Sequence, residues 1–163
     1  MGRLGCNCGA AMSSVDCPSP NIIHIFEEKE VKNALKENPS IGLWEFRSIR
    51  RKYEYWFCTD CKRVHQVDVE TGYCVLRYTP IGKSEDQIGI MGIPADWQEL
   101  YVITDAELDD VTERDFSIKL IEYLPIVKRR VMLSPDQQTA VVFDTGTGIE
   151  LERYIAEAVP PVE

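Results

Sequence analysis

The chain has 163 residues, of which 44% are apolar and 28% charged, and it contains six cysteines and only two histidines. These values are typical of one folded domain with a substantial core and exclude a disordered chain. The net charge of −9 argues against a protein that mainly grips phosphate backbones. No apolar run approaches the length of a membrane helix and the first residues lack a signal-peptide pattern, so we expect a cytoplasmic protein with no membrane partner.

The first half of the chain predicts strands around a short helix. A short apolar strand is expected first, followed by an amphipathic helix that stops at Asn38-Pro39. Two strands are then expected on either side of a basic turn, Arg50-Arg51-Lys52, and a second hairpin around Glu70-Thr71-Gly72. The ranges are Ile22–Phe26 for the first strand, Glu27–Glu37 for the helix, Leu43–Phe57 for the first hairpin and 64–78 for the second.

The second half predicts strand, helix, strand and hairpin. Thr104-Asp105-Ala106-Glu107 has the pattern of a capped helix start. A final hairpin is expected around residues 144–148, where an acidic-Thr-Gly turn resembles the earlier one. The other expected elements are a strand at Trp97–Ile103, a helix at Thr112–Leu124 and a strand at Ile126–Leu133.

These elements predict an α+β fold, in which a zinc-ribbon-like β-hairpin module packs on a mixed antiparallel sheet with one or two helices. The Gly- and Pro-containing stretch 80–94 suggests a division into residues 1–82, a metal-bearing module with a helical insertion, and residues 83–163, an acidic α+β unit. One continuous domain is the alternative. The charge is −1 over residues 1–43, +3 over 44–83 and −11 over 84–163.

The strongest chemical signal is two close cysteine pairs, Cys6-Asn7-Cys8 and Cys58-Thr59-Asp60-Cys61. Four thiolates match the tetrahedral, sulfur-rich coordination that Zn²⁺ prefers. A site with four protein ligands has no open position for water or substrate, so we expect the zinc to be structural. It would fasten the N-terminal segment to the aromatic hairpin.

This arrangement resembles the zinc-ribbon proteins, in which two cysteine-bearing knuckles on neighbouring hairpins hold one structural zinc. The resemblance covers Cys6–Gly9 and about residues 44–78. The sequence departs from the pattern in three ways: the first pair has a one-residue spacer, Lys62 stands where many knuckles have Gly, and 49 residues separate Cys8 from Cys58.

Other roles for the cysteines stay open. Cys17 or His65 could replace one of the four ligands. A disulfide is less expected in a reducing compartment. Cys74 lies in an apolar strand pattern and is read as a buried free thiol, and His24 as a strand residue rather than a ligand.

The motifs that resemble those of enzymes do not predict a catalytic site. Val141–Gly146 resembles the active-site strand of aspartic proteases, but the chain has a single Asp-Thr-Gly where two carboxylates must share a proton. Asp144 is therefore interpreted as a turn residue that bonds the backbone. Hydrolysis by His65, Asp144 or an incompletely ligated zinc is the third hypothesis, and the protein is not expected to be an enzyme.

We expect a non-enzymatic, zinc-stabilised interaction protein. In general character the acidic chain resembles immunity or antitoxin proteins that block basic nuclease toxins. The expected surface for a basic protein partner is acidic: Asp105, Glu107, Asp109, Asp110, Glu113 and Asp115. The alternative is a zinc-ribbon nucleic-acid-binding or transcription-associated module that uses the basic aromatic hairpin, with residues such as Arg50, Tyr55 and Trp56.

Overall fold

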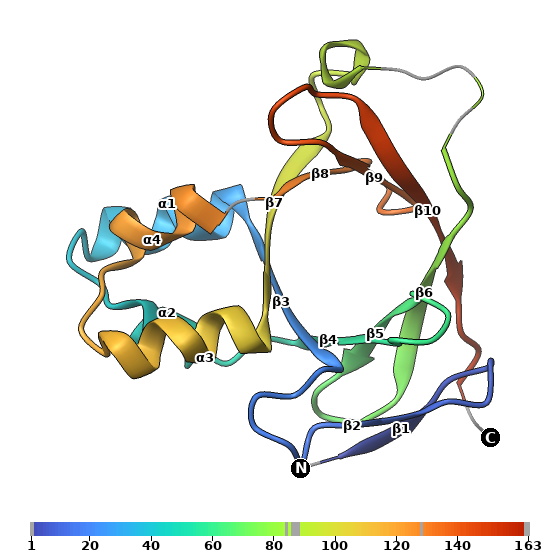
Figure 1. Cartoon of the computed structure of the whole chain (residues 1–163), viewed down its shortest axis with the longest axis horizontal. Helices are drawn as coiled ribbons and strands as arrows, with labels where there is room; N and C mark the ends of the chain where they lie inside the picture. The colour runs from blue at the N-terminus through green and yellow to red at the C-terminus, as the bar shows by residue number, and fades with distance from the viewer. Residues whose placement is uncertain (1, 84, 86–88, 128, 162–163) are drawn as a thin grey trace.

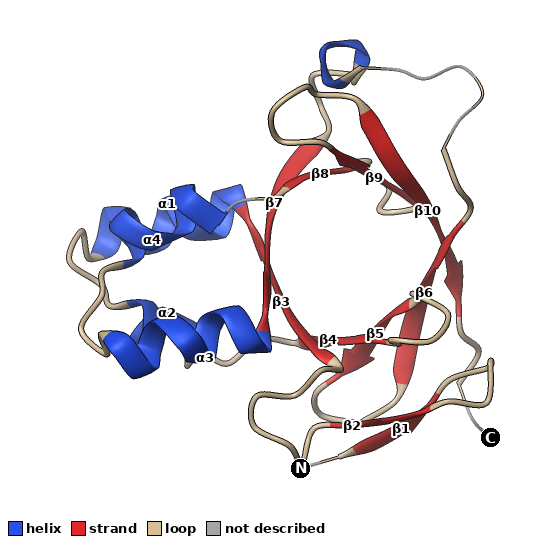
Figure 2. Cartoon of the chain, in the orientation of Figure 1, coloured by secondary structure: helices blue, strands red, loops and turns tan. Residues whose placement is uncertain are grey.

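Eight strands form a closed antiparallel β-barrel, drawn nearly end-on in Figures 1 and 2. This computed structural model describes residues 2–83, 85, 89–127 and 129–161. Around the ring, each strand is hydrogen-bonded to its neighbours in the order β10 (Glu150–Ala158), β6 (Cys74–Pro80), β5 (Val64–Asp68), β4 (Tyr53–Phe57), β3 (Ile22–Glu27), β7 (Gln98–Thr104), β8 (Arg130–Leu133) and β9 (Thr139–Phe143).

The expected open sheet carrying a zinc-ribbon module is therefore wrong. Two long-range pairings close the ring: β3 pairs with β7, and β6 pairs with β10. Period-2 alternation marks one face of a strand as apolar, but it is the same whether that face lines a flat sheet or a barrel interior. Because the paired strands are far apart in sequence, the local pattern could not reveal closure.

Four helices cover the outer face of β3 and β7, on the left in Figure 1. They are α1 (Glu28–Glu37), α2 (Leu43–Arg47), α3 (Asp105–Arg114) and α4 (Leu120–Val127). Their apolar side chains and those of the two strands form one buried cluster that includes Phe26, Leu43, Phe46, Ile103 and Leu108. This cluster anchors α3 and α2 against the barrel wall.

A short N-terminal hairpin covers another part of the barrel. Strands β1 (Arg3–Gly5) and β2 (Ala11–Ser13) pair with each other and lie below β4, β5 and β6 in Figure 1. Met12 packs with Trp56 and Val67 in a second buried cluster. The hairpin thereby keeps the outer face of β4 and β5 out of water.

Most of the predicted strands are confirmed, but the segment after residue 42 is not a strand. Residues 43–47 form the short helix α2, in which Leu43 and Phe46 lie three residues apart on one face and are both fully buried. The apolar residues Leu43, Trp44, Phe46 and Ile49 also fit the alternation of a strand, which is the element that the sequence predicts here. Spacing alone cannot separate the two in so short an apolar run.

The helix predicted at 112–124 is also divided. Helix α3 starts earlier, at the predicted cap, where the Thr104 and Glu107 side chains each bond the other's backbone N–H. It ends before Asp115, whose carboxylate accepts hydrogen bonds from the backbone N–H and hydroxyl of Ser117. Side-chain bonds of this kind compete with helix continuation. The strand predicted from Ile126 begins only at Arg130, and Lys128 lies outside the described residues.

Two hairpins share the acidic-Thr-Gly turn that the sequence predicts. Asp68 accepts hydrogen bonds from the backbone N–H of Glu70 and Thr71, and Gly72 takes φ 71°. Asp144 accepts in the same way from Gly146 and Thr147, and Gly148 takes φ 70°. A positive φ is favourable only for residues such as Gly. Asp144 is thus a turn residue, as interpreted.

Residues 1–82 supply four strands of the barrel, and residues 83–163 supply the other four. Their independent stability stays a prediction. Within the proposed boundary the structure has a short 3₁₀ helix, η1 (Ile90–Gly92), while residues 84 and 86–88 lie outside the described residues. Among the described helices, none has the length and apolar character needed to cross a bilayer.

Candidate metal centre and neighbouring polar clusters

The first cysteine pair lies in the turn between β1 and β2. The backbone N–H of Cys6 bonds the Ala10 carbonyl at 2.8 Å, and the N–H of Gly9 bonds the Cys6 carbonyl at 2.9 Å. Gly9 takes φ 95°, which turns the chain back after Cys8 at no steric cost. The turn thus holds both sulfurs on the same side as the second pair.

The second pair lies in the turn between β4 and β5. The backbone N–H of Cys58 bonds the Arg63 carbonyl, and the N–H of Lys62 bonds the Cys58 carbonyl, each at 2.9 Å. Lys62 takes φ 63°, the left-handed conformation that favours glycine. The departure noted at Lys62 therefore does not prevent the knuckle, because the lysine adopts the backbone conformation that a glycine would.

The four sulfurs of Cys6, Cys8, Cys58 and Cys61 all lie within 4.8 Å of one another. Two of the distances are 3.4 Å, between Cys6 and Cys61, and 3.6 Å, between Cys8 and Cys58. Tetrahedral coordination with metal–sulfur bonds of about 2.3 Å places neighbouring sulfurs about 3.8 Å apart. The predicted set therefore comes together with the size that a metal ion of this kind requires.

None of the six cysteines, all of which are described, forms a disulfide. The sulfurs of the cluster are too far apart for a bond of about 2.05 Å and close enough to share protons. Burial raises the pKa of Cys6 to about 12. At Cys61, burial also opposes ionisation, but hydrogen bonds from the Arg63 backbone and neighbouring thiols outweigh it and lower the pKa to about 6. A divalent cation would replace these shared protons.

The alternative ligands lie elsewhere. Cys17 is exposed and does not belong to the cluster. His65 is 1% exposed, and its Nδ1 lies 3.8 Å from the Cys74 sulfur. Cys74 is half-buried with its thiol 3.2 Å from the Leu76 carbonyl, which agrees with its reading as a free thiol. Arg63 lies 3.6 Å from the Cys61 sulfur, where its charge would partly offset that of four thiolates.

Sequence analysis missed a row of buried polar groups next to the cluster. Trp56, His65 and Arg77 lie opposite one another on β4, β5 and β6. Among the described residues, Trp56 Nε1, His65 Nε2 and Arg77 Nε are buried side-chain atoms with no hydrogen-bond partner. Such groups are rare in folded proteins. Strand alternation predicts which face each side chain lies on, but only the registers of β4 on β5 and of β5 on β6 bring the three together.

We expect His65 to make stability depend on pH. Burial, together with the charges of Arg77 and Arg63, lowers the pKa of His65 to about 4. Between pH 6.5 and 4 the unfolded chain therefore binds a proton that the folded chain does not, so the free energy of unfolding falls as pH falls. The expected loss is about 3 kcal/mol.

The measurement is chemical denaturation of wild type and His65→Gln across this pH range. Cys74, the other titratable group in contact, and the cysteine cluster are unchanged in the variant, so their contributions cancel in the difference. A difference in unfolding free energy that stays constant from pH 7 to pH 4 would contradict the buried, neutral state of His65.

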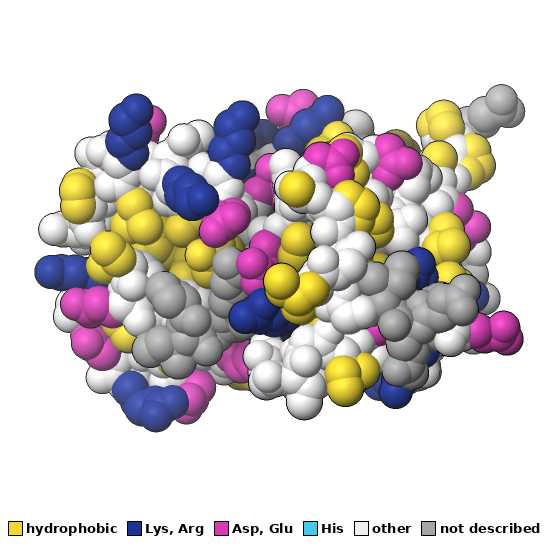
Figure 3. All heavy atoms as spheres, turned by 90° about the horizontal axis from the view of Figure 1, so that it is seen from above, with side chains coloured by type: hydrophobic (Ala, Val, Ile, Leu, Met, Phe, Trp, Pro, Cys, Tyr) yellow, Lys and Arg dark blue, Asp and Glu magenta, His cyan; other side chains and the backbone are white. Residues whose placement is uncertain are grey.

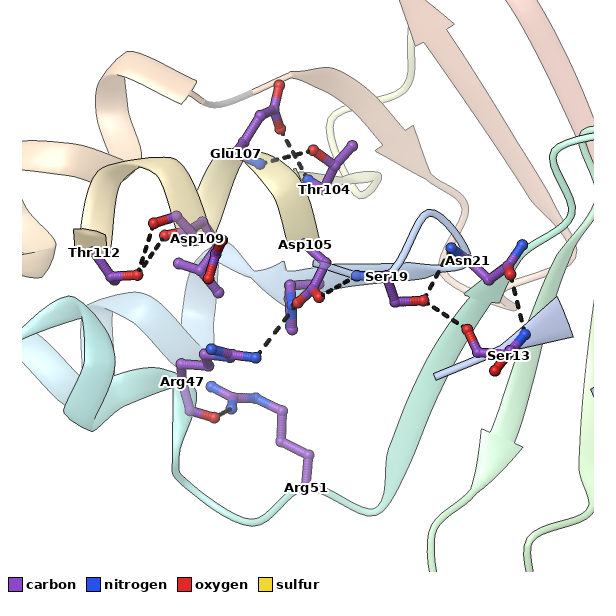
Figure 4. Close-up of polar contacts among 12 residues, drawn as sticks. Ser13, Ser19, Asn21, Arg47, Arg51, Thr104, Asp105, Glu107, Asp109 and Thr112 are labelled. Atoms are coloured by element: carbon purple, nitrogen blue, oxygen red, sulfur yellow. Dashed lines mark hydrogen bonds and ion pairs between the residues drawn. The ribbon is translucent and has the colours of Figure 1, made fainter. Parts of the chain in front are cut away.

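Asp105, the first of the predicted partner-binding residues, lies instead at the centre of a buried polar network (Figure 4). One carboxylate oxygen accepts a hydrogen bond from the Ser19 backbone N–H at 2.8 Å. The other lies 2.8 Å from His24 Nε2 and 3.4 Å from Arg47 Nη2. Burial opposes ionisation of Asp105, but His24, Ser19 and Arg47 outweigh it and lower its pKa. Asp105 joins α3 to α2 and to the segment before β3.

The other acidic residues of α3 do not form a uniform free surface. Glu107 pairs with Arg129 and closes the helix cap, and Asp110 pairs with Arg114. Asp109 is half-buried, while Glu113 and Asp115 are exposed. On the side of the molecule that carries α1 and α4, shown in Figure 3, acidic and basic side chains are also interspersed. The acidic character of the sequence is thus partly neutralised by internal pairs.

The basic aromatic hairpin is likewise engaged within the chain. Arg51 pairs with Glu30 at 2.7 Å and lies over the rings of Phe26 and Phe46. Tyr53 and Tyr55 line the barrel interior, and Trp56 is buried beneath the N-terminal hairpin. Tyr55 and Trp56 therefore have little access to bases, whereas Trp44 in α2 is 38% exposed.

Fold and site together define a closed antiparallel barrel with a four-cysteine cluster of metal-binding size. Residues 2–84 match a family described as a domain of unknown function, DUF8617, and the chain belongs to this family. The matched region contains all four clustered cysteines and the strands β1–β6. Neither the curated proteins nor the solved structures include a match to the chain.

Proposed function

We propose that the protein is a non-enzymatic binding protein whose fold is completed by one structural Zn²⁺, held by Cys6, Cys8, Cys58 and Cys61. The observation that carries this proposal is the convergence of four sulfurs within 4.8 Å of one another. Thiolate ligands select Zn²⁺ over hard cations such as Mg²⁺ and Ca²⁺. Four of them fill a tetrahedral shell, so the metal would have no position for a reacting water.

The metal would act by holding two turns together. Cys6 and Cys8 belong to the N-terminal hairpin, and Cys58 and Cys61 belong to the barrel. A three-residue strand pair such as β1–β2 is not stable by itself in water. Zinc would supply the missing free energy and keep Met12 packed against Trp56.

A non-enzymatic role is supported by the positions of the two residues considered for hydrolysis. His65 is buried beside Cys74, and burial together with the charges of Arg77 and Arg63 lowers its pKa to about 4. Asp144 is bound by the backbone of its own turn. The partners of each residue therefore belong to the fold. His65 lies in β5 and Asp144 follows β9.

The basic protein partner stays a prediction. Of its expected surface on α3, Asp105 is buried and Glu107 is paired with Arg129, while Asp109 is half-buried. Asp110, Glu113 and Asp115 are exposed, and Asp110 pairs with Arg114 of the same helix. Rim charges of this kind would affect association rate more than affinity.

Metal analysis of the purified protein tests the zinc proposal. We expect one equivalent of zinc per chain, and after exchange for Co²⁺ a visible absorption spectrum of a tetrahedral tetrathiolate. Cys8→Ser is expected to lose this spectrum, whereas Cys17→Ser is expected to keep it. A chain without bound metal, or a Co²⁺ spectrum of three thiolates with water or histidine, would contradict the closed four-sulfur site.

A further inference from the structure

The barrel interior contains a cavity of about 560 Å³ that is partly open to solvent and to which all eight strands contribute. Eight-stranded barrels are narrow enough to be filled by their own side chains or to hold one small ligand. Pockets for small molecules usually measure about 300–1,000 Å³. This cavity therefore has the size of a ligand site.

The interior is hollow because one wall carries small side chains. On the β4 side, Tyr53, Tyr55 and Phe57 point inward, whereas the facing wall of β8 and β9 presents Val131, Ala140 and Val142. Several inward apolar residues, including Ile25, Val102 and Val142, stay only half-buried although they belong to the interior cluster. Moving an apolar molecule from water onto this apolar lining is favourable, so an apolar occupant is favoured.

The cavity also contains neutral hydrogen-bond donors. The hydroxyl groups of Tyr55, Tyr78 and Tyr154 belong to residues that line it. Tyr55 accepts a hydrogen bond from Gln66 at 3.3 Å. Burial raises the pKa of both Tyr78 and Tyr154, so these phenols remain protonated and can donate to a ligand oxygen.

Both arginines that line the cavity are paired with carboxylates of the chain. Arg51 is bound to Glu30, and Arg129 to Glu107. Lys52 and Glu27 also line the cavity, and the Lys52 ammonium lies over the Tyr53 ring. An anionic ligand would have to compete with these carboxylates, so the interior favours an uncharged molecule.

We infer that the barrel binds one uncharged, mostly apolar small molecule carrying a hydrogen-bond-accepting oxygen, with the tyrosine phenols as its polar contacts. This inference rests on the proposed binding role but not on the zinc. It gives that role a ligand class.

The test is a fluorescence titration of the full, metal-bearing protein with Nile red, an uncharged apolar dye with a carbonyl oxygen. We expect saturable one-to-one binding with blue-shifted emission. Val142→Trp, which fills the cavity, is expected to weaken binding at least tenfold. Ile155→Trp, on the exposed side of the neighbouring strand, is the matched control and is expected to bind as wild type does. Tyr78→Phe is expected to lower affinity about fivefold through one lost hydrogen bond.

Circular dichroism and thermal melting establish that each variant is folded. If Val142→Trp does not fold, Ala140→Leu serves as the variant that fills the cavity. Zinc content measured on the same samples separates the two proposals, since a chain can hold metal without binding dye. Non-saturable binding, equal binding by the filled and control variants, or stronger binding of the anionic dye anilinonaphthalene sulfonate would overturn the inference.

Discussion

Cys58→Ser is expected to release the bound metal and free the N-terminal hairpin from the barrel. Cys58 is fully buried, and its sulfur lies 3.6 Å from that of Cys8 in the opposite turn. At a free zinc concentration about 1,000 times the dissociation constant, binding stabilises the folded state by about 4 kcal/mol, which the variant would lose. Chelation of the wild type is expected to have the same effect.

Hydrogen exchange locates this loss in the molecule. Amide protons of β1 and β2, and the N–H of Cys6 bonded to Ala10, are expected to exchange much faster in the variant. Amides of β3 and β7, which lie over the helix cluster, are expected to change less. Cys17→Ser, which removes an exposed thiol outside the cluster, is the control. Equal protection of β1 and β2 in wild type and Cys58→Ser would show that the metal does not hold the hairpin.

The metal centre could be predicted from sequence because its signal is local. Each pair has a short spacer, and two pairs supply the number of thiolates that zinc requires. The geometry of each turn was less accessible. A lysine at position 62 argues against a knuckle, because the turn needs a left-handed backbone that favours glycine. Lys62 nevertheless adopts this conformation, with its N–H bonded to the Cys58 carbonyl, and the residue type does not reveal this.

The fold could be predicted only at the level of single elements. Strands β3, β5, β6, β7 and β9 follow from apolar runs and turn residues. Barrel closure depends on β3 meeting β7 and β6 meeting β10, pairings between segments with no shared pattern. The cavity exists only because the barrel is closed, so the prediction of an open sheet could not include it. Strand alternation places Tyr53 and Tyr55 on one face of a hairpin, and only barrel closure makes that face the lining of an interior cavity.

The sequence likewise could not show which carboxylates of the predicted α3 surface are engaged within the chain. Composition and charge runs count carboxylates but do not say which of them meet a base from another element. Asp105 meets Arg47 from α2 and His24 from β3, which are distant in sequence. Only Glu107 carried a local signal of an internal role, as the third helix residue after a capping threonine.

Asp105→Ala is expected to lower the free energy of unfolding by about 3 kcal/mol, near the lower end for a broken buried ion pair because Arg47 keeps some contact with water. The substitution leaves Arg47, His24 and the Ser19 N–H without their shared acceptor. Asp110→Ala, which breaks the exposed pair with Arg114 on the same helix, is the control and is expected to change stability little.

The pH dependence of this effect distinguishes a buried carboxylate from simple loss of packing. Because the pKa of Asp105 is lowered in the folded state, its stabilising contribution is present above its ordinary pKa and is lost as pH falls through the folded value. The stability difference between wild type and Asp105→Ala should therefore be full at pH 7 and shrink below about pH 4. Urea denaturation at both pH values measures it. A difference that is small at pH 7, or equal for Asp105→Ala and Asp110→Ala, would mean that Asp105 is free for the partner surface first assigned to it.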